Sequence, residues 1–242
     1  MPSQYILASQ ITPLHTRRAV RVRLVRTYEV PELRGGITSK SKECLFHDEE
    51  GTYIHATIPK EDVFKYRSLL IEGKVYSVKN FLVVTNYYTY KTSHHKYIIK
   101  FNYKTSVKES KNRNFPNFMF RLKSFESLSD STTVNDKELF DIMGRVVEMY
   151  SPVEKVIAGK QSLLMDFLLA DTQDRHLKCT IWDDHVAAMV PFFNSIQEEP
   201  LIVLIQMCRA KVVSGEVRIT SSYDATKMWI NHSSPEFTDF RD

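Results

Sequence analysis

Aromatic and cationic side chains are interleaved in the segment 86–96. It holds Tyr87, Tyr88, Tyr90, Lys91, His94, His95 and Lys96. A second segment, 28–42, is basic through Arg34, Lys40 and Lys42. Aromatic rings stack on nucleic-acid bases at about 1–3 kcal/mol each, and cations neutralise phosphates. The two segments therefore predict a surface for single-stranded nucleic acid, although packing within a hairpin would account for Tyr87 and Tyr88 as well.

Catalytic or metal-binding chemistry has weaker support. The candidate ligands for a metal are Asp166, Asp171, Asp174, Asp183 and Asp184. However, Asp171 and Asp174 belong to a turn that occurs twice in the chain, and Asp183–Asp184 is typical of a helix start. The His94–His95 pair lacks further ligands at metal spacing, the three cysteines form no C-x-x-C pair, and no phosphate-binding glycine loop occurs. We expect no enzyme, no metal and no cofactor.

An internal repeat sets the architecture. The stretch 48–59, an acidic turn followed by an apolar strand, recurs as 171–182. Five positions match at one constant offset: Asp48, Ile54, Thr57, Ile58 and Val63 correspond to Asp171, Leu177, Thr180, Ile181 and Val186. Two copies are too few for a solenoid, and each is long enough to be a domain. The sequence predicts a tandem duplication of one small β domain.

Hydrophobic periodicity gives the element order within each copy. In the first we expect strands over 20–26, 44–46, 52–58, 75–85 and 97–103, with a helix over 61–71; in the second, strands over 139–147, 163–169, 179–182, 201–210 and 217–222, with a loop over 152–160 and an amphipathic segment over 184–194. Five strands with a helix between the third and fourth are typical of the OB-fold. The fold class is therefore all-β, with two tandem OB-fold barrels.

The predicted domain limits follow from these elements. We expect a lead-in over 1–13, a first OB-fold over 14–106, a linker over 107–137, a second OB-fold over 138–230 and a tail over 231–242. An OB-fold binds its ligand across strands 2 and 3, between the loops that join strands 1–2 and 4–5. In the first copy those loops are the segments 28–42 and 86–96.

Charge is distributed unevenly along the chain. Residues 1–123 contain 22 Lys and Arg against 10 Asp and Glu, whereas residues 124–242 contain 11 against 19. The first half should therefore attract a polyanion more strongly. The longest apolar run, 201–205, is far shorter than the ~20 residues of a membrane helix, and the start of the chain has no signal-peptide pattern. We expect no membrane association and a reducing, intracellular compartment.

Several short motifs resemble one known family. In the first half these are 54–57, 73–76, 97–102 and 105–107; in the second they are 141–144, 179–183 and 230–236. Together, in this order, they resemble the tandem DNA-binding domains of the replication protein A large (70 kDa) subunit. The segments 46–51 and 224–227 are most similar to plant members, which implies a truncated plant-type paralogue. We expect no counterpart of the family's zinc-bearing, trimer-forming domain or of its N-terminal docking domain, so the resemblance does not imply trimer assembly.

The resemblance also implies site residues. Tyr90 matches the family's stacking aromatic in a loop of the first domain, and Trp182 matches the one that ends strand 3 of the second. Pro59 and Val213 replace the other two rings, so binding should be weaker than in the main replication protein, with Tyr87 or Tyr88 as partial substitutes. Arg26, His55 and Arg209 match basic contacts. Further candidates for phosphate or base contacts are Arg34, Lys42, Lys91, Lys96, Lys100, Lys178 and Lys211.

The expected function is single-stranded DNA binding in DNA replication, repair or recombination, in the nucleus, with replication or repair proteins as further partners. The first domain should be the stronger site because of its positive charge. Two alternatives stay open: a protein-interaction scaffold, and a binder of single-stranded RNA, since ring stacking alone does not distinguish RNA from DNA.

Overall fold

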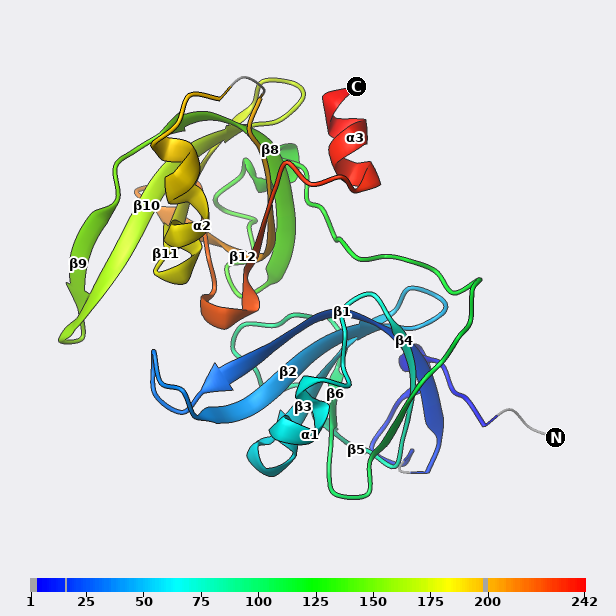
Figure 1. The fold of residues 1–242 in the computed structure, drawn as a ribbon. Helices are drawn as coiled ribbons and strands as arrows, with labels where there is room; N and C mark the ends of the chain where they lie inside the picture. The colour runs from blue at the N-terminus through cyan, green and yellow to red at the C-terminus, as the bar shows by residue number, and fades with distance from the viewer. Residues whose placement is uncertain (1–3, 16, 198–199) are drawn as a thin grey trace. The chain divides into compact units, whose positions relative to one another are not determined.

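The computed structural model describes residues 4–15, 17–197 and 200–242. The chain divides into two compact units, Met1–Phe120 and Arg121–Asp242 (Figure 1). Each unit is built on its own sheet, whose neighbouring strands are mostly antiparallel. The predicted fold class, two tandem OB-fold barrels made mainly of strands, is confirmed. Within the described ranges, no helix is both long enough and apolar enough to cross a bilayer.

The sheet of the first unit has the order β5-β6-β3-β2-β1-β4-β7. Its strands are β1 (Ala19–Pro31), β2 (Ser39–His47), β3 (Tyr53–Pro59), β4 (Val75–Lys79), β5 (Leu82–Thr85), β6 (Tyr97–Lys100) and β7 (Ser106–Glu109). Strand β1 shows why they form: Val20, Val22 and Leu24 enter the core, and the arginines between them do not. This period of two is that of a strand with one buried face.

The predicted strand over 75–85 and the predicted helix over 61–71 differ from the structure. The strand expected over 75–85 is broken into β4 and β5 at Asn80, whose left-handed conformation (φ 59°) is not that of a strand. The helix expected over 61–71 is only α1 (Val63–Arg67), preceded by the 3-10 turn η2 (Lys60–Asp62). Buried Tyr66 still anchors it, with its ring 5.2 Å from that of Phe101.

The basic loop expected over 28–42 is also shorter than predicted. Strand β1 continues to Pro31 and β2 begins at Ser39, so that only 32–38 connects them. Tyr28 pairs with Glu43, and Val30 pairs with Ser41. Arg34 lies in the remaining loop, whereas Lys40 and Lys42 are strand residues.

In the second unit the strands close into a ring. The sheet order is β11-β13-β12-β8-β10-β9, and β11 also pairs with β10. The strands are β8 (Leu139–Met149), β9 (Val153–Ile157), β10 (Lys160–Ala170), β11 (His176–Trp182), β12 (Ile202–Val213), β13 (Glu216–Thr220) and β14 (Lys227–Ile230), which pairs with β12. The loop expected over 152–160 contains β9, which forms a hairpin with β10 through Ala158 and Gly159, both at positive φ.

Helices and short turns complete the second unit. Helix α2 (Asp184–Phe193) follows β11 and buries Val186 and Met189, while η4 (Tyr223–Ala225) precedes β14. Within the segment expected as the linker, β7 pairs with β4 in the first unit, and η3 (Glu126–Leu128) brings Phe125 and Leu128 into the second core. The segment expected as the tail contains α3 (Pro235–Arg241). In the first unit, η1 (Ala8–Gln10) follows the bridge between Tyr5 and Ala19.

The repeated acidic turn has the same structural role in both units. Asp48 Oδ1 accepts hydrogen bonds from the backbone of Glu50 (3.0 Å) and Thr52 (2.8 Å). Asp171 Oδ1 accepts them from Gln173 and Arg175, both at 2.9 Å. In each case the carboxylate replaces a backbone acceptor and stabilises the turn. The repeat is therefore a folding signal, as its position before a strand suggested.

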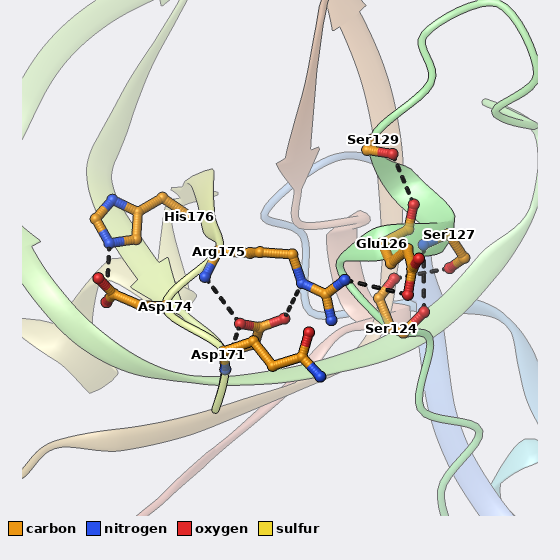
Figure 2. Close-up of polar contacts among 9 residues, drawn as sticks. Ser124, Glu126, Ser127, Ser129, Asp171, Asp174, Arg175 and His176 are labelled. Atoms are coloured by element: carbon orange, nitrogen blue, oxygen red, sulfur yellow. Dashed lines mark hydrogen bonds and ion pairs between the residues drawn. The ribbon is translucent and has the colours of Figure 1, made fainter.

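In the second unit the turn also secures the segment before β8 (Figure 2). The guanidinium of Arg175 lies 2.8 Å from Asp171 Oδ2 and 3.1 Å from Glu126 Oε2 in η3. Burial opposes ionisation of Asp171, yet hydrogen bonds from the Arg175 backbone and side chain hold its pKa below the usual value. The turn thus acts as a charged tether within the unit.

We predict that Asp171→Asn lowers the free energy of unfolding of the second unit by about 1–2 kcal/mol, because it removes charge-assisted hydrogen bonds. Because the folded-state pKa of Asp171 is lowered, its contribution is present above the unfolded pKa of ~3.9 and disappears as the pH falls through the folded value. Urea unfolding at neutral pH measures the loss. Asp174→Asn is the matched control, since Asn tolerates the positive φ there; equal effects of the two variants would contradict the tether.

Candidate nucleic-acid interface

The side chains that leave the core on β2 and β3 define the outer face of the first unit. Cys44 and Phe46 on β2, with Ile54 and Ala56 on β3, belong to the core. The residues next to them along each strand therefore point to the opposite side. They are Glu43, Leu45, His55 and Thr57, which pair across the two strands as Glu43 with Thr57 and Leu45 with His55. This is the face on which an OB-fold binds its ligand.

The 86–96 loop, which joins β5 to β6, makes close contacts with this outer face. The Tyr88 hydroxyl donates a hydrogen bond to Glu43 Oε1. His55 Nδ1 lies 2.6 Å from Thr92 Oγ1, and the His55 and Tyr88 rings are 4.8 Å apart. Glu43 is 4% exposed and His55 2%. In this conformation the loop and the outer face bury a carboxylate, an imidazole and a phenol together.

The loop is also held by its own backbone. The Asn86 amide donates to the carbonyl oxygen of His95 at 3.2 Å. Lys91 Nζ donates to the carbonyl oxygens of Asn86 and Tyr88, each at 2.9 Å. Ser93 Oγ donates to the Tyr53 carbonyl at 2.8 Å, which ties the loop to β3. The Lys91 ammonium, predicted as a phosphate contact, thus closes the loop on itself.

Electrostatics at this contact favour a protonated tyrosine. Burial, followed by the charge of Glu43 and the hydrogen bond to it, raises the pKa of Tyr88 well above its usual value. The phenol therefore stays a donor. Glu43 Oε2 and His55 Nε2 are both buried and have no hydrogen-bond partner among the described residues. The contact includes polar atoms whose burial is costly.

Five of the predicted contacts of the first unit are exposed, among them Arg34 in the 32–38 loop. Tyr87 is 62% exposed and stacks on Tyr88, with ring centroids 4.8 Å apart; Tyr90 is 37% exposed. Lys96 and Lys100 are exposed as well. Tyr88, by contrast, is packed between Tyr87 and His55. The structure therefore separates the three loop tyrosines into two accessible rings and one that is held against the outer face.

The three arginines of β1 all make contacts within the protein. Arg26 forms an ion pair with Glu72 at 2.9 Å. Arg23 donates to three backbone carbonyls, at 2.7 Å to Pro116, 2.8 Å to Phe115 and 2.5 Å to Gly73, and its desolvation lowers its pKa. Arg21 lies 4.2 Å from the centre of the Tyr5 ring.

The other predicted cations near β1 differ in exposure: Lys42 is 4% exposed, and Arg34 is exposed in the 32–38 loop. Sequence patterning could not distinguish structural from exposed cations.

The corresponding surface of the second unit is bordered by a short turn and not by a long loop. On β11, Leu177, Cys179 and Ile181 enter the core, so Lys178 and Trp182 point outward, and both are partly exposed. Asp166 on β10 lies beside them: its carboxylate accepts a 2.5 Å hydrogen bond from Thr180 Oγ1 and lies 3.8 Å from Lys178 Nζ. Strands β12 and β13 are joined by the short turn Ser214–Gly215, both residues at positive φ, whereas the first unit has the 86–96 loop.

Strands β12 and β13 add three cations to this surface. Arg209 and Lys211 point outward because Ala210 between them enters the core, and Arg218 does so because Ile219 next to it is buried. The sequence prediction included Arg209 and Lys211 and missed Arg218. The alternation Val217–Arg218–Ile219 carries the signal that could have identified it. Val213 pairs with Glu216 at the end of the same hairpin.

Comparison with known protein families identifies one whose model matches this chain. The domain of unknown function DUF223 matches residues 9–131, half of the chain. The chain belongs to the DUF223 family. The match covers residues 9–120 of the first unit, including the outer face and the 86–96 loop, and residues 121–131 of the second unit.

The predicted resemblance to the replication protein A large subunit is confirmed for this DUF223 protein. It is 25% identical over 224 residues to a 70 kDa DNA-binding subunit of replication protein A from Arabidopsis thaliana, and 28% identical over 227 residues to one from Oryza sativa subsp. japonica. These alignments cover 89% and 90% of the chain and 35% of each relative, so the chain spans about a third of their length.

A solved structure shares the fold. A replication protein A heterotrimer bound to single-stranded DNA superposes with a TM-score of 0.68 at 18% identity, over 98% of this DUF223 chain and 54% of the other. At that identity the likeness supports the fold, and the ligand of this chain has to be argued from its own residues.

We predict that Tyr88→Phe loosens the 86–96 loop, because the variant leaves the buried Glu43 carboxylate without its phenol donor. The expected loss of stability is about 1–3 kcal/mol, with faster hydrogen exchange at the amides of 86–96. Tyr87→Phe is the matched control, since the neighbouring ring is exposed. Unchanged exchange in Tyr88→Phe would contradict the proposed contact between loop and outer face.

Proposed function

We propose that this DUF223 protein binds single-stranded DNA by base stacking and phosphate neutralisation. The observation that carries the proposal is the outward face of β11, β12 and β13, where Trp182 shares one surface with Lys178, Arg209 and Lys211. A ring and several cations on one face are what a single strand requires, since bases stack on the ring and the backbone meets the cations. The accessible Tyr87 and Tyr90, with Lys96 and Lys100, supply a second contact region on the first unit.

The two units contribute unequally in this proposal. The sequence favoured the first, because its half carries the positive charge. Its β1 arginines are, however, engaged with Glu72, Tyr5 and backbone carbonyls, and its outer face holds the 86–96 loop. We therefore assign the larger share of contact energy to the second unit. The first unit contributes attraction at longer range.

The relatives support this ligand by their names, DNA-binding subunits of replication protein A, and one solved neighbour was bound to single-stranded DNA. By the same analogy we propose a non-enzymatic role in DNA replication, repair or recombination, in the nucleus. A protein-interaction scaffold and an RNA binder are the competing functions. Stacking on rings is sequence-tolerant and does not by itself exclude RNA.

The first prediction for this function concerns salt. A fluorescently labelled oligo-dT should bind the full chain, and its affinity should fall steeply between ~50 and ~200 mM salt. Release of counterions from about four phosphates gives a slope of about −3 in log K against log salt, a loss of about 50-fold over this range. A scaffold would show no such binding. Competition with a matched ribo-oligonucleotide that displaced the DNA at lower concentration would make RNA the ligand.

The second prediction concerns stacking. Trp182→Ala should weaken oligo-dT binding by about 5–150-fold, equivalent to ~1–3 kcal/mol, while Trp182→Phe retains most of the affinity because it keeps a ring. Tyr90→Ala should have a smaller effect in the same direction, with Tyr103→Ala as its control because Tyr103 is 83% exposed on the same unit. Thermal unfolding is measured in parallel. A collapse of the fold in Trp182→Ala would show that Trp182 serves the core and not the ligand.

A further inference from the structure

Two cations face each other across β12 and β13. Lys211 is the direct cross-strand partner of Arg218, next to the pair formed by Ala210 and Ile219. Because Ala210 and Ile219 both enter the core, Lys211 and Arg218 both point outward on the same side of the hairpin. Side chains in this arrangement start about 5 Å apart at their Cβ atoms.

Such a pair is unfavourable without an anion. Like charges directly opposite each other destabilise a sheet. Neither cation has an ion-pair or hydrogen-bond partner among the described residues, and Arg218 Nε is shielded from solvent with no acceptor. Glu216 lies on the same face, yet within the described part of the chain it forms no ion pair with either cation. A guanidinium N–H that loses water without gaining an acceptor costs free energy.

The pair adjoins the proposed binding face. Thr220 on β13 is the neighbour of Thr180 on β11, and both lie outside the core. By alternation, Arg218 and Lys178 lie on this same side of the two neighbouring strands. Arg209 follows on β12, two residues before Lys211. The outward cations of three adjacent strands thus share a surface with Trp182, although two of them have partners: Asp166 for Lys178, and an intramolecular contact for Arg209.

We propose that the Lys211–Arg218 pair is a binding subsite for the phosphodiester backbone of a single-stranded nucleic acid, whose neighbouring bases extend toward Trp182. A phosphate between the two cations would replace their repulsion by two charge-assisted contacts. This inference rests on the proposed function and deepens it. It assigns Arg218, which sequence patterning missed, and gives Lys211 a defined partner.

The test uses the full chain with labelled oligo-dT. Arg218→Gln and Lys211→Gln should each weaken binding by about 3–10-fold and reduce the slope of log K against log salt by about 0.7, the value for one phosphate contact on a single strand. Arg218→Lys should keep most of the slope because it keeps the charge. Arg145→Gln is the matched control, an exposed arginine of the same unit that pairs with Asp174 at 3.7 Å; it should bind like the parent.

A charge reversal separates binding from folding. Lys211→Glu places a carboxylate opposite Arg218, so its melting temperature should equal or exceed that of the parent, while affinity falls by more than 10-fold. If the Gln variants and Lys211→Glu bind with the parent's affinity and slope, the subsite is wrong and the proposed function stands. If the parent itself fails to bind oligo-dT, the proposed function fails and the subsite with it. A Lys211→Glu chain that melts well below the parent would contradict the repulsion inferred between Lys211 and Arg218, and its weaker binding would not support the subsite.

Discussion

Strands β1, β3 and β11 turn alternate side chains into the cores of their units, and this constraint determines which of their residues can meet a ligand. Because Cys179 and Ile181 are committed to the core, Lys178 and Trp182 have no other direction than outward. A one-residue slip would exchange the two sets, with charged residues in the core. The pairing register therefore fixes the composition of the outer face before any ligand is considered.

A side chain that points outward is not always accessible to a ligand. In the first unit the outward Glu43 and His55 are buried by Tyr88 and Thr92 of the 86–96 loop. Burying an acid there is tolerable because a phenol donates to it, yet its second oxygen lacks a partner among the described residues. A polyanion would in any case meet an acidic group at that point. In the second unit, Asp166 pairs with Thr180 as Glu43 pairs with Thr57, and Lys178, which is partly exposed, stands where the first unit has His55.

The sequence was sufficient for features that repeat or alternate locally. The duplicated turn around Asp48 and Asp171 revealed two domains, and the period of two in β1 located its buried face. The break at Asn80 was missed because one residue with positive φ leaves little trace in hydrophobicity. The strand β9 was missed because its hairpin partner, and not its own composition, stabilises it. The Tyr88–Glu43 hydrogen bond joins residues 45 positions apart, which no local pattern encodes.

One connection distinguishes the outer faces of the duplicated units. Where the first has the 86–96 loop, the second has the turn Ser214–Gly215. Positive charge, however, is concentrated in the first half of the chain, because the excess of Lys and Arg lies in residues 1–123. Attraction between charges extends over a Debye length of ~10 Å and mainly raises the rate of encounter, whereas stacking requires contact and mainly slows release. Attraction and retention of a nucleic acid can therefore be divided between the two halves of one chain. The half with the stronger positive field need not be the half that holds the single-stranded nucleic acid by stacking.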